Sequence, residues 1–188
     1  MVMKIKYDKK NWICFGVCIA ITIVGIVLDQ LTKSLFERLF QQGKLPITVI
    51  DNVVIFTYAL NDGAAWGSLS GSSVLFFALT IVALPVFVWI FVARIKRGWC
   101  GSLGFACVIS GTIGNAIDRA FLGDGFFNGK VRDFIATQFL GKLDFICNVA
   151  DIFLTIGVVI LILGMIVFDD DAIFSKRSAD KGGTIDHE

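Results

Sequence analysis

Four long apolar segments, separated by polar connections, set the pattern of this 188-residue sequence. They cover approximately residues 12–28, 74–92, 99–117 and 149–168, and each approaches the ~20 residues that a helix needs to cross a bilayer. Helices are expected because backbone groups in lipid must form their hydrogen bonds within the segment. The sequence therefore predicts an all-α membrane protein, a bundle of four transmembrane helices, in which Pro85 kinks the second helix.

The connections between these segments differ in character. The first, residues 34–73, contains two runs of β-branched and aromatic residues at 47–50 and 53–58, with a short turn between them. This pattern predicts a small β-sheet or hairpin outside the membrane, on the extracytoplasmic side. The third connection, residues 120–147, is rich in glycine and phenylalanine, and the stretch around Asp133 is expected to be extended.

The whole apolar part of the chain is interpreted as one domain. Residues 1–168 form a single integral membrane domain, and residues 169–188 form a polar cytoplasmic tail. Residues 1–28 imitate a secretory signal peptide, but no small-residue cleavage site follows the apolar run, so they are interpreted as an uncleaved first helix. The third apolar segment is rich in glycine, serine and threonine, which allow close helix contacts and predict a central position in the bundle.

The distribution of positive charge predicts the orientation. Ten of the 17 Lys and Arg residues lie in the N-terminal arm, in the connection at 94–97 and in the tail after residue 169. Cytoplasmic flanks of membrane helices carry an excess of these residues, so both termini are expected in the cytoplasm. Trp12, Trp89 and Trp99 fit anchoring at the inner interface. The formal net charge is +1, so no global positive field indicates nucleic acid.

Few residue types are available for catalysis at membrane depth. The one histidine, His187, lies in the polar tail, and the five cysteines lack the spacing of metal ligands. The cysteines are interpreted as small buried hydrophobic residues, and no metal or other cofactor is expected. Carboxylates within or beside membrane segments are costly and usually functional, which makes Asp133 and Asp151 the main candidates.

Two polar groups belong to the outer end of the first helix and to the connection after it. Asp29 and Lys33 are four residues apart and share a helix face. They form either an ion pair that stabilises the helix end or a pair that props or lines a site. Asn61 and Gly63 belong to a short Asn-Asp-Gly sequence that predicts a tight turn.

Two further polar groups lie at the outer ends of the third and fourth helices. Asn115, Asp118 and Arg119 occupy positions i, i+3 and i+4, so one helix face presents an amide, a carboxylate and a guanidinium. Asn148 and Asp151 repeat the amide–carboxylate spacing where the fourth helix opens. Amides beside carboxylates at this depth indicate a polar network whose members must all be satisfied.

A site that contains both Asp133 and Asp151 suits peptide hydrolysis. Two carboxylates that share a site cannot both ionise cheaply, so one keeps its proton at higher pH. One carboxylate then acts as a base toward water while the other donates to the carbonyl oxygen. Residue spacing alone leaves open a proton or ion pathway, as in a transporter subunit, and a purely structural polar core.

A resemblance to a known family narrows these alternatives. Five short sequences occur in order along the chain: DQLTK at 29–33, NDGAAW at 61–66, GNAIDR at 114–119, VRDF at 131–134 and NVAD at 148–151. Together they resemble the lipoprotein signal peptidase family, also called signal peptidase II, over roughly residues 12–168. The resemblance implies an aspartyl endopeptidase of the bacterial inner membrane. It would remove the signal peptide of diacylglyceryl-modified prolipoproteins by cleaving just before the lipidated cysteine.

The resemblance also implies residue roles and partners. Asp133 and Asp151 match the catalytic pair, on the periplasmic side. The residues that match substrate-binding or pair-orienting positions are Asn61, Asn115, Arg119 and Asn148. The residues that match supporting positions are Asp29, Lys33, Gly63 and Asp118. Membrane lipids and globomycin-type inhibitors are expected as partners, nucleic acid is not, and the protein is expected to be a monomer.

Three positions depart from the family pattern. Cys147 precedes Asn148 where phenylalanine is usual, and Ser110 replaces the first residue of a glycine pair. Arg132 stands beside Asp133 where an apolar residue is common. Successive side chains of an extended segment point to opposite faces, so Arg132 is expected to point away from Asp133.

Overall fold

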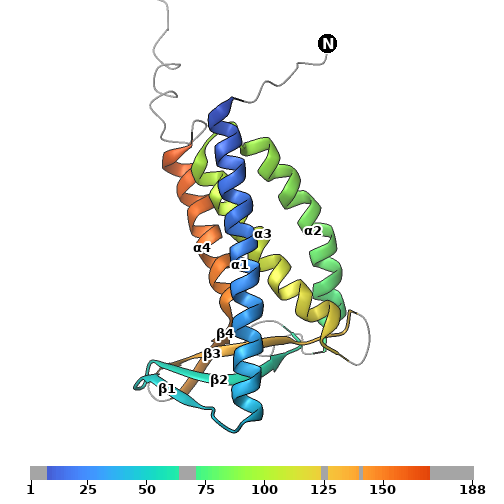
Figure 1. The fold of residues 1–188 in the computed structure, drawn as a ribbon, viewed down its shortest axis with the longest axis vertical. Helices are drawn as coiled ribbons and strands as arrows, with labels where there is room; N and C mark the ends of the chain where they lie inside the picture. The colour runs from blue at the N-terminus through green and yellow to red at the C-terminus, as the bar shows by residue number, and fades with distance from the viewer. Residues whose placement is uncertain (1–7, 64–70, 124–126, 140–141, 170–188) are drawn as a thin grey trace, which may run out of the picture.

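Four long helices and a four-stranded sheet make up the protein, as a computed structural model shows for residues 8–63, 71–123, 127–139 and 142–169 (Figure 1). The helices are α1 (Lys9–Gln41), α2 (Ser73–Arg94), α3 (Trp99–Phe121) and α4 (Val149–Leu163), which a short π-helix, η2 (Gly164–Phe168), continues. Within these residues all four are long and apolar enough to span a membrane. The prediction of four membrane helices is therefore confirmed.

Helix α1 is longer than the sequence analysis expected. Asp8 caps its start by accepting from the backbone N–H of Asn11 over 2.8 Å. The helix then runs for 33 residues, about 50 Å at the α-helical rise, which exceeds the ~30 Å hydrocarbon core. Its last turns lie on the sheet, where the rings of Phe36 and Phe134 stack 4.2 Å apart. Residues 34–41, expected to begin the first connection, are helical, and they pack on the sheet through buried Phe36 and through Phe40, whose ring stacks on Tyr58.

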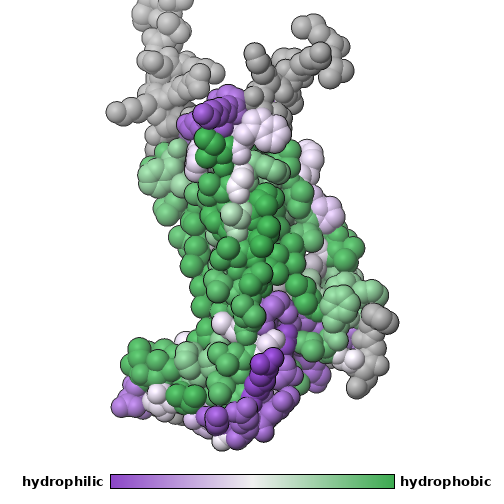
Figure 2. Space-filling view, viewed as in Figure 1, coloured by the Kyte–Doolittle hydropathy of each residue, from purple (hydrophilic) through white to green (hydrophobic). Residues whose placement is uncertain are grey.

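Helix α3 occupies the centre of the bundle, as its small residues predicted. It is largely buried, whereas the other three helices expose most of their apolar surface. Glycines allow α3 and α4 to approach closely, since a Cβ atom on Gly157 would lie 2.8 Å from the carbonyl oxygen of Gly104. The exposed apolar side chains surround the bundle, and hydrophilic residues gather near its two ends (Figure 2). This surface matches a lipid environment along the bundle.

The sheet lies across the end of the bundle opposite to the start of α1 (Figure 1). Its strands are β1 (Ile47–Ile50), β2 (Val54–Asn61), β3 (Val131–Phe139) and β4 (Lys142–Cys147), antiparallel in the order β1-β2-β3-β4. The first hairpin was predicted, and the second was missed. Residues 131–138 of β3 are buried or half-buried on both faces, so this strand lacks the clear polar–apolar alternation of a strand with one exposed face.

The opposite end of the bundle is closed by a buried carboxylate. Asp169 is 2% exposed, accepts from the backbone N–H of Gly101 over 3.1 Å and pairs with Arg94 Nη2 at 2.7 Å. These contacts join the end of α2, the first turn of α3 and the residue that follows η2. Asp169, which the sequence analysis assigned to the polar tail, is thus part of the bundle, and residues 170–188 of that tail lie outside the described residues.

The close contact of α3 and α4 makes a prediction about Gly157. We expect Gly157→Ala to lower the free energy of unfolding by roughly 1–3 kcal/mol, because the added methyl meets backbone atoms of α3. Thermal unfolding of the purified protein in detergent measures the change. Gly16→Ala is the matched control, since a Cβ atom there meets nothing within 4 Å and alanine favours a helix. Equal stability of the two variants would contradict the close packing.

Candidate active site

The carboxylate of Asp133 is buried on one face of the sheet. It lies on β3 opposite Ala59 of β2 and is 2% exposed. Asn61 is two residues beyond Ala59, so its side chain lies diagonally on the same face of the sheet. The Nδ2 atom of Asn61 donates to Asp133 Oδ2 over 2.9 Å, and that of Asn148 donates to Asp133 Oδ1 over 2.6 Å. Both carboxylate oxygens therefore accept from amides.

The carboxylate of Asp151 is part of the helix cap of α4. The side chain of Asn148 accepts from the backbone N–H of Asp151, and the backbone N–H of Asn148 donates to Asp151 Oδ2, each over 3.1 Å. This reciprocal arrangement is a capping box. From α3, Asn115 Nδ2 donates to Asp151 Oδ1 over 2.8 Å. Because the side chain of Asn148 also contacts Asp133, this one residue joins the two carboxylates.

The amide oxygens of the asparagines are fixed so that their NH2 groups face the carboxylates. The oxygen of Asn61 accepts from the backbone N–H of Gly63 over 3.0 Å. The oxygen of Asn115 accepts from Lys33 Nζ over 2.9 Å. Since an ammonium or a backbone N–H can only donate, each amide must present its nitrogen on the other side. The oxygen of Asn148 is fixed in the same way by its helix cap.

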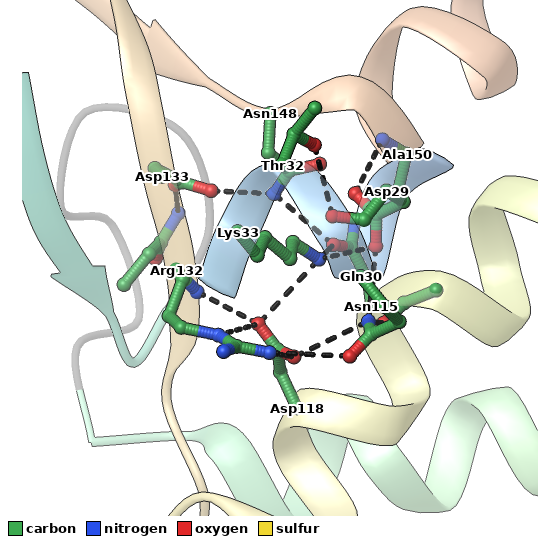
Figure 3. Close-up of polar contacts among 12 residues, drawn as sticks. Asp29, Gln30, Thr32, Lys33, Asn115, Asp118, Arg132, Asp133, Asn148 and Ala150 are labelled. Carbon is green, nitrogen blue, oxygen red and sulfur yellow. Dashed lines mark hydrogen bonds and ion pairs between the residues drawn. The ribbon is translucent and has the colours of Figure 1, made fainter. Parts of the chain in front are cut away.

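A buried ammonium group connects this network to α1. Lys33 is 0% exposed and lies between two carboxylates, with Nζ 2.8 Å from Asp29 and 3.5 Å from Asp118 (Figure 3). Its bond to Asn115 completes the contacts around the charge. A charge removed from water must be paired and hydrogen-bonded in this way. The Asp29–Lys33 pair is therefore a buried ion pair that lies beside Asn115 and Asp118.

Asp118 and Arg119, at the end of α3, contact different parts of the protein. Asp118 turns toward α1 and β3, where it pairs with Lys33 and Arg132. Arg119 lies on the other side with its guanidinium over the ring of Phe76, 5.4 Å from the ring centre. The sequence expected one shared face, but the one-residue step between Asp118 and Arg119 separates them around the helix.

A cavity of about 300 Å³ opens beside the pair of carboxylates. It is lined by residues of α2, α3, α4 and the sheet: Asn61, Gly63, Phe76, Thr80, Thr112, Asn115, Arg119, Phe145, Ile146, Asp151 and Leu154. Asp151 lines this cavity, and Asp133 adjoins it through its hydrogen bond with Asn61, which also lies in the wall. The lining combines a few polar groups with apolar side chains, as ligand-binding pockets do.

Burial and charge give Asp133 the chemistry of an acid. Burial, together with the nearby Asp151, raises the pKa of Asp133 from 3.8 to about 6, although the hydrogen bond from Asn61 opposes the shift. Asp133 therefore keeps its proton at a pH where an ordinary aspartate has lost it. The same surroundings raise the pKa of Cys147 to about 11, so its side chain stays a thiol at neutral pH.

Comparisons with known proteins show the family of the chain. A model of the signal peptidase (SPase) II family matches residues 21–167. The chain belongs to the signal peptidase II family. A lipoprotein signal peptidase of Staphylococcus haemolyticus is 36% identical over 158 residues, covering 84% of this chain and 94% of the relative. One from Geobacillus kaustophilus is 38% identical over 145 residues, covering 76% and 88%.

A solved structure supports the same family assignment. A bacterial membrane enzyme solved by the in meso method at 2.3 Å resolution superposes with a TM-score of 0.65 and 30% identity. The superposition covers 92% of this chain and 94% of that one. The protein is thus a multi-pass bacterial membrane protease with four membrane helices and a small antiparallel sheet.

The described structure brings all the expected site residues into one region, and it adds two that sequence reasoning missed, Gln30 and Glu37. Gln30 and Glu37 of α1 accept hydrogen bonds from Arg132, each over 3.1 Å. As predicted, Arg132 points away from Asp133, and its side chain is engaged on the opposite face of β3. The sequence contained a pattern that could have indicated Gln30 and Glu37, since both share one face of α1 with Lys33 at helical spacing. Of the sequence NDGAAW, residues 64–66 lie outside the described residues.

Proposed function

We propose that Asp133 and Asp151 are the catalytic pair with which this peptidase removes signal peptides from lipoprotein precursors. The observation that carries the proposal is that Asn148 contacts both carboxylates while Asp151 and Asn61, the partner of Asp133, line the cavity. This observation favours a peptidase over the two alternatives. A purely structural polar core would not need a cavity beside its carboxylates, and a proton pathway would not need asparagine amides bound to both of them.

The proposed reaction uses the two carboxylates in different protonation states. Ionised Asp151 takes a proton from water as the water oxygen bonds to the peptide carbonyl carbon, and protonated Asp133 gives its proton to the carbonyl oxygen. In the second step the carbon–nitrogen bond breaks and the leaving nitrogen takes the proton from Asp151. Asp133 regains a proton from a hydroxyl of the tetrahedral intermediate as the new carboxyl group forms. The high pKa of Asp133 suits the donor role.

The surrounding residues have distinct proposed roles. Asn61, Asn115 and Asn148 hold the carboxylates by donating to them. Arg119 lies in the cavity wall, where its guanidinium is available to a substrate carbonyl. The residues that support these groups from behind are Asp29, Lys33, Gly63 and Asp118. They bind the amides or the backbone rather than the substrate.

We also propose that the substrate carries a diacylglyceryl group on the cysteine after the cleaved bond. Apolar residues such as Phe76 and Leu154 line the cavity, and exposed apolar side chains continue along the helices. Acyl chains that stay in lipid can anchor a precursor, because each buried methylene contributes about 0.8 kcal/mol. The same cavity is the proposed site for globomycin-type inhibitors, whose cyclic peptides would fill it in place of the substrate.

The proposed orientation puts both termini in the cytoplasm and the catalytic pair at the periplasmic face. Support comes from the positive charges near the start of α1 and in the α2–α3 connection, at the end of the bundle away from the sheet (Figure 1). All the proposed site residues come from one chain, so we expect a monomer to be sufficient.

The catalytic roles predict the effect of neutral, isosteric substitutions. We expect Asp133→Asn and Asp151→Asn each to lower the cleavage rate about a thousandfold or more, because neither amide can complete the proton transfers. The measurement is a gel-shift assay with purified protein and a diacylglyceryl-modified prolipoprotein. Asp51→Asn is the control, since Asp51 is exposed in the turn between β1 and β2. A well-folded Asp133→Asn or Asp151→Asn variant that cleaves at the rate of this control would refute the proposed pair.

The lipid anchor predicts a preference between two precursors of nearly identical sequence. We expect a precursor whose cysteine is replaced by serine, and which therefore carries no diacylglyceryl group, to be cleaved poorly or not at all. The comparison uses the lipidated precursor at equal concentration in the same lipid mixture. Equal rates for the two forms would show that the peptide alone is recognised and would remove the acyl anchor from the proposal.

A further inference from the structure

A chain of alternating charges runs behind the proposed catalytic pair. From one end to the other it consists of Asp29, Lys33, Asp118 and Arg132 (Figure 3). Glu37 pairs with Arg132 Nη1 at 3.1 Å. The first four side chains are buried, whereas Glu37 is 32% exposed. The buried four carry two negative and two positive charges, so the group is neutral only when Arg132 is included.

The two carboxylates of this chain each hold the backbone next to a catalytic residue. Asp29 Oδ1 accepts from the backbone N–H of Ala150, which directly precedes Asp151, over 2.9 Å. Asp118 Oδ2 accepts from the backbone N–H of Arg132, which directly precedes Asp133, over 3.0 Å. Lys33 Nζ lies between the two carboxylates. The chain therefore links the main chain of α4 at one catalytic aspartate to that of β3 at the other.

The side chain of Arg132 is the firmest part of this link. Its Nη2 donates to Asp118 Oδ1 over 2.7 Å and its Nε to Asp118 Oδ2 over 3.2 Å, a two-point contact that fixes the carboxylate plane. By contrast, the distance from Lys33 to Asp118 is 3.5 Å. Without the guanidinium, Asp118 would keep one long ion pair, and the buried group would carry a net negative charge. Such a charge is costly away from water, so the backbone contacts of Asp118 would shift.

We propose that this buried charge chain sets the separation of the two catalytic carboxylates, and that Arg132 is a positioning residue that fixes β3 within it. The inference rests on the proposed roles of Asp133 and Asp151. It gives a function to Arg132, one of the positions at which this chain departs from the family pattern. Arg132 touches no substrate in this account and acts only through the backbone that carries Asp133.

The test compares Arg132→Met with Arg132→Lys in the lipidated-precursor assay. We expect Arg132→Met to lower kcat by about ten- to a hundredfold, because a small displacement of a reacting group has effects of this size, while KM changes by less than about twofold. Arg132→Lys should recover part of kcat, since it restores the charge without the two-point contact. Arg38→Met is the matched control, because Arg38 is exposed on α1, and it should keep the wild-type kcat.

A double variant covers the case in which Arg132→Met does not fold. Asp118→Asn combined with Arg132→Met leaves a neutral buried group, so we expect it to be folded and still to have a low kcat. A folded Arg132→Met or double variant with the kcat of Arg38→Met would overturn the inference, as would a change confined to KM. Asp133→Asn in the same assay separates the two proposals. If Asp133→Asn is inactive and Arg132→Met is normal, only the positioning role fails, whereas an active Asp133→Asn removes the catalytic pair itself.

Discussion

The burial of one ammonium group constrains the site more than any other interaction. Lys33 lies on a membrane helix with no exposed surface, so acceptors must surround its charge. They come from α1 itself, as Asp29, and from α3, as Asp118 and Asn115. Each of these acceptors has a second partner, in α4, in β3 or at Asp151. The pairing of a single charge thus fixes three helices and the sheet relative to one another.

The length of α1 and the small residues of α3 make this arrangement possible. Because α1 continues beyond the apolar segment, one helix carries both Lys33, which contacts α3, and Phe36, which packs on the sheet. Because glycines line α3, the neighbouring helices approach closely enough for short polar side chains to meet. A Cβ atom on Gly114, for example, would lie 2.6 Å from Asp29 Oδ2. Packing and polar contacts therefore depend on each other.

Much of the fold and the site could be predicted from the sequence, and the failures have physical reasons. Long apolar runs identify membrane helices, so the four segments could be predicted. The end of α1 could not, because its last turns are amphipathic. The β3–β4 hairpin was missed because a two-sided strand shows only a weak alternation. The spacing of Asn148 and Asp151 indicated their pairing, whereas the contact of Asp118 with Arg132 joins α3 to a strand and has no local signal. Long-range ion pairs of this kind require the fold.

The titration of the buried carboxyl groups is the most direct test of the account, because the mechanism requires one of them to keep its proton. Infrared spectroscopy of the purified protein between about pH 4 and about pH 8 separates protonated from ionised carboxyl groups. The account predicts a component that ionises at about pH 6, that is absent in Asp133→Asn and that moves to higher pH in Asn61→Ala, where a hydrogen bond to the ionised form is lost. A wild-type protein in which this component is missing, or an Asp133→Asn variant that retains it, would contradict the account.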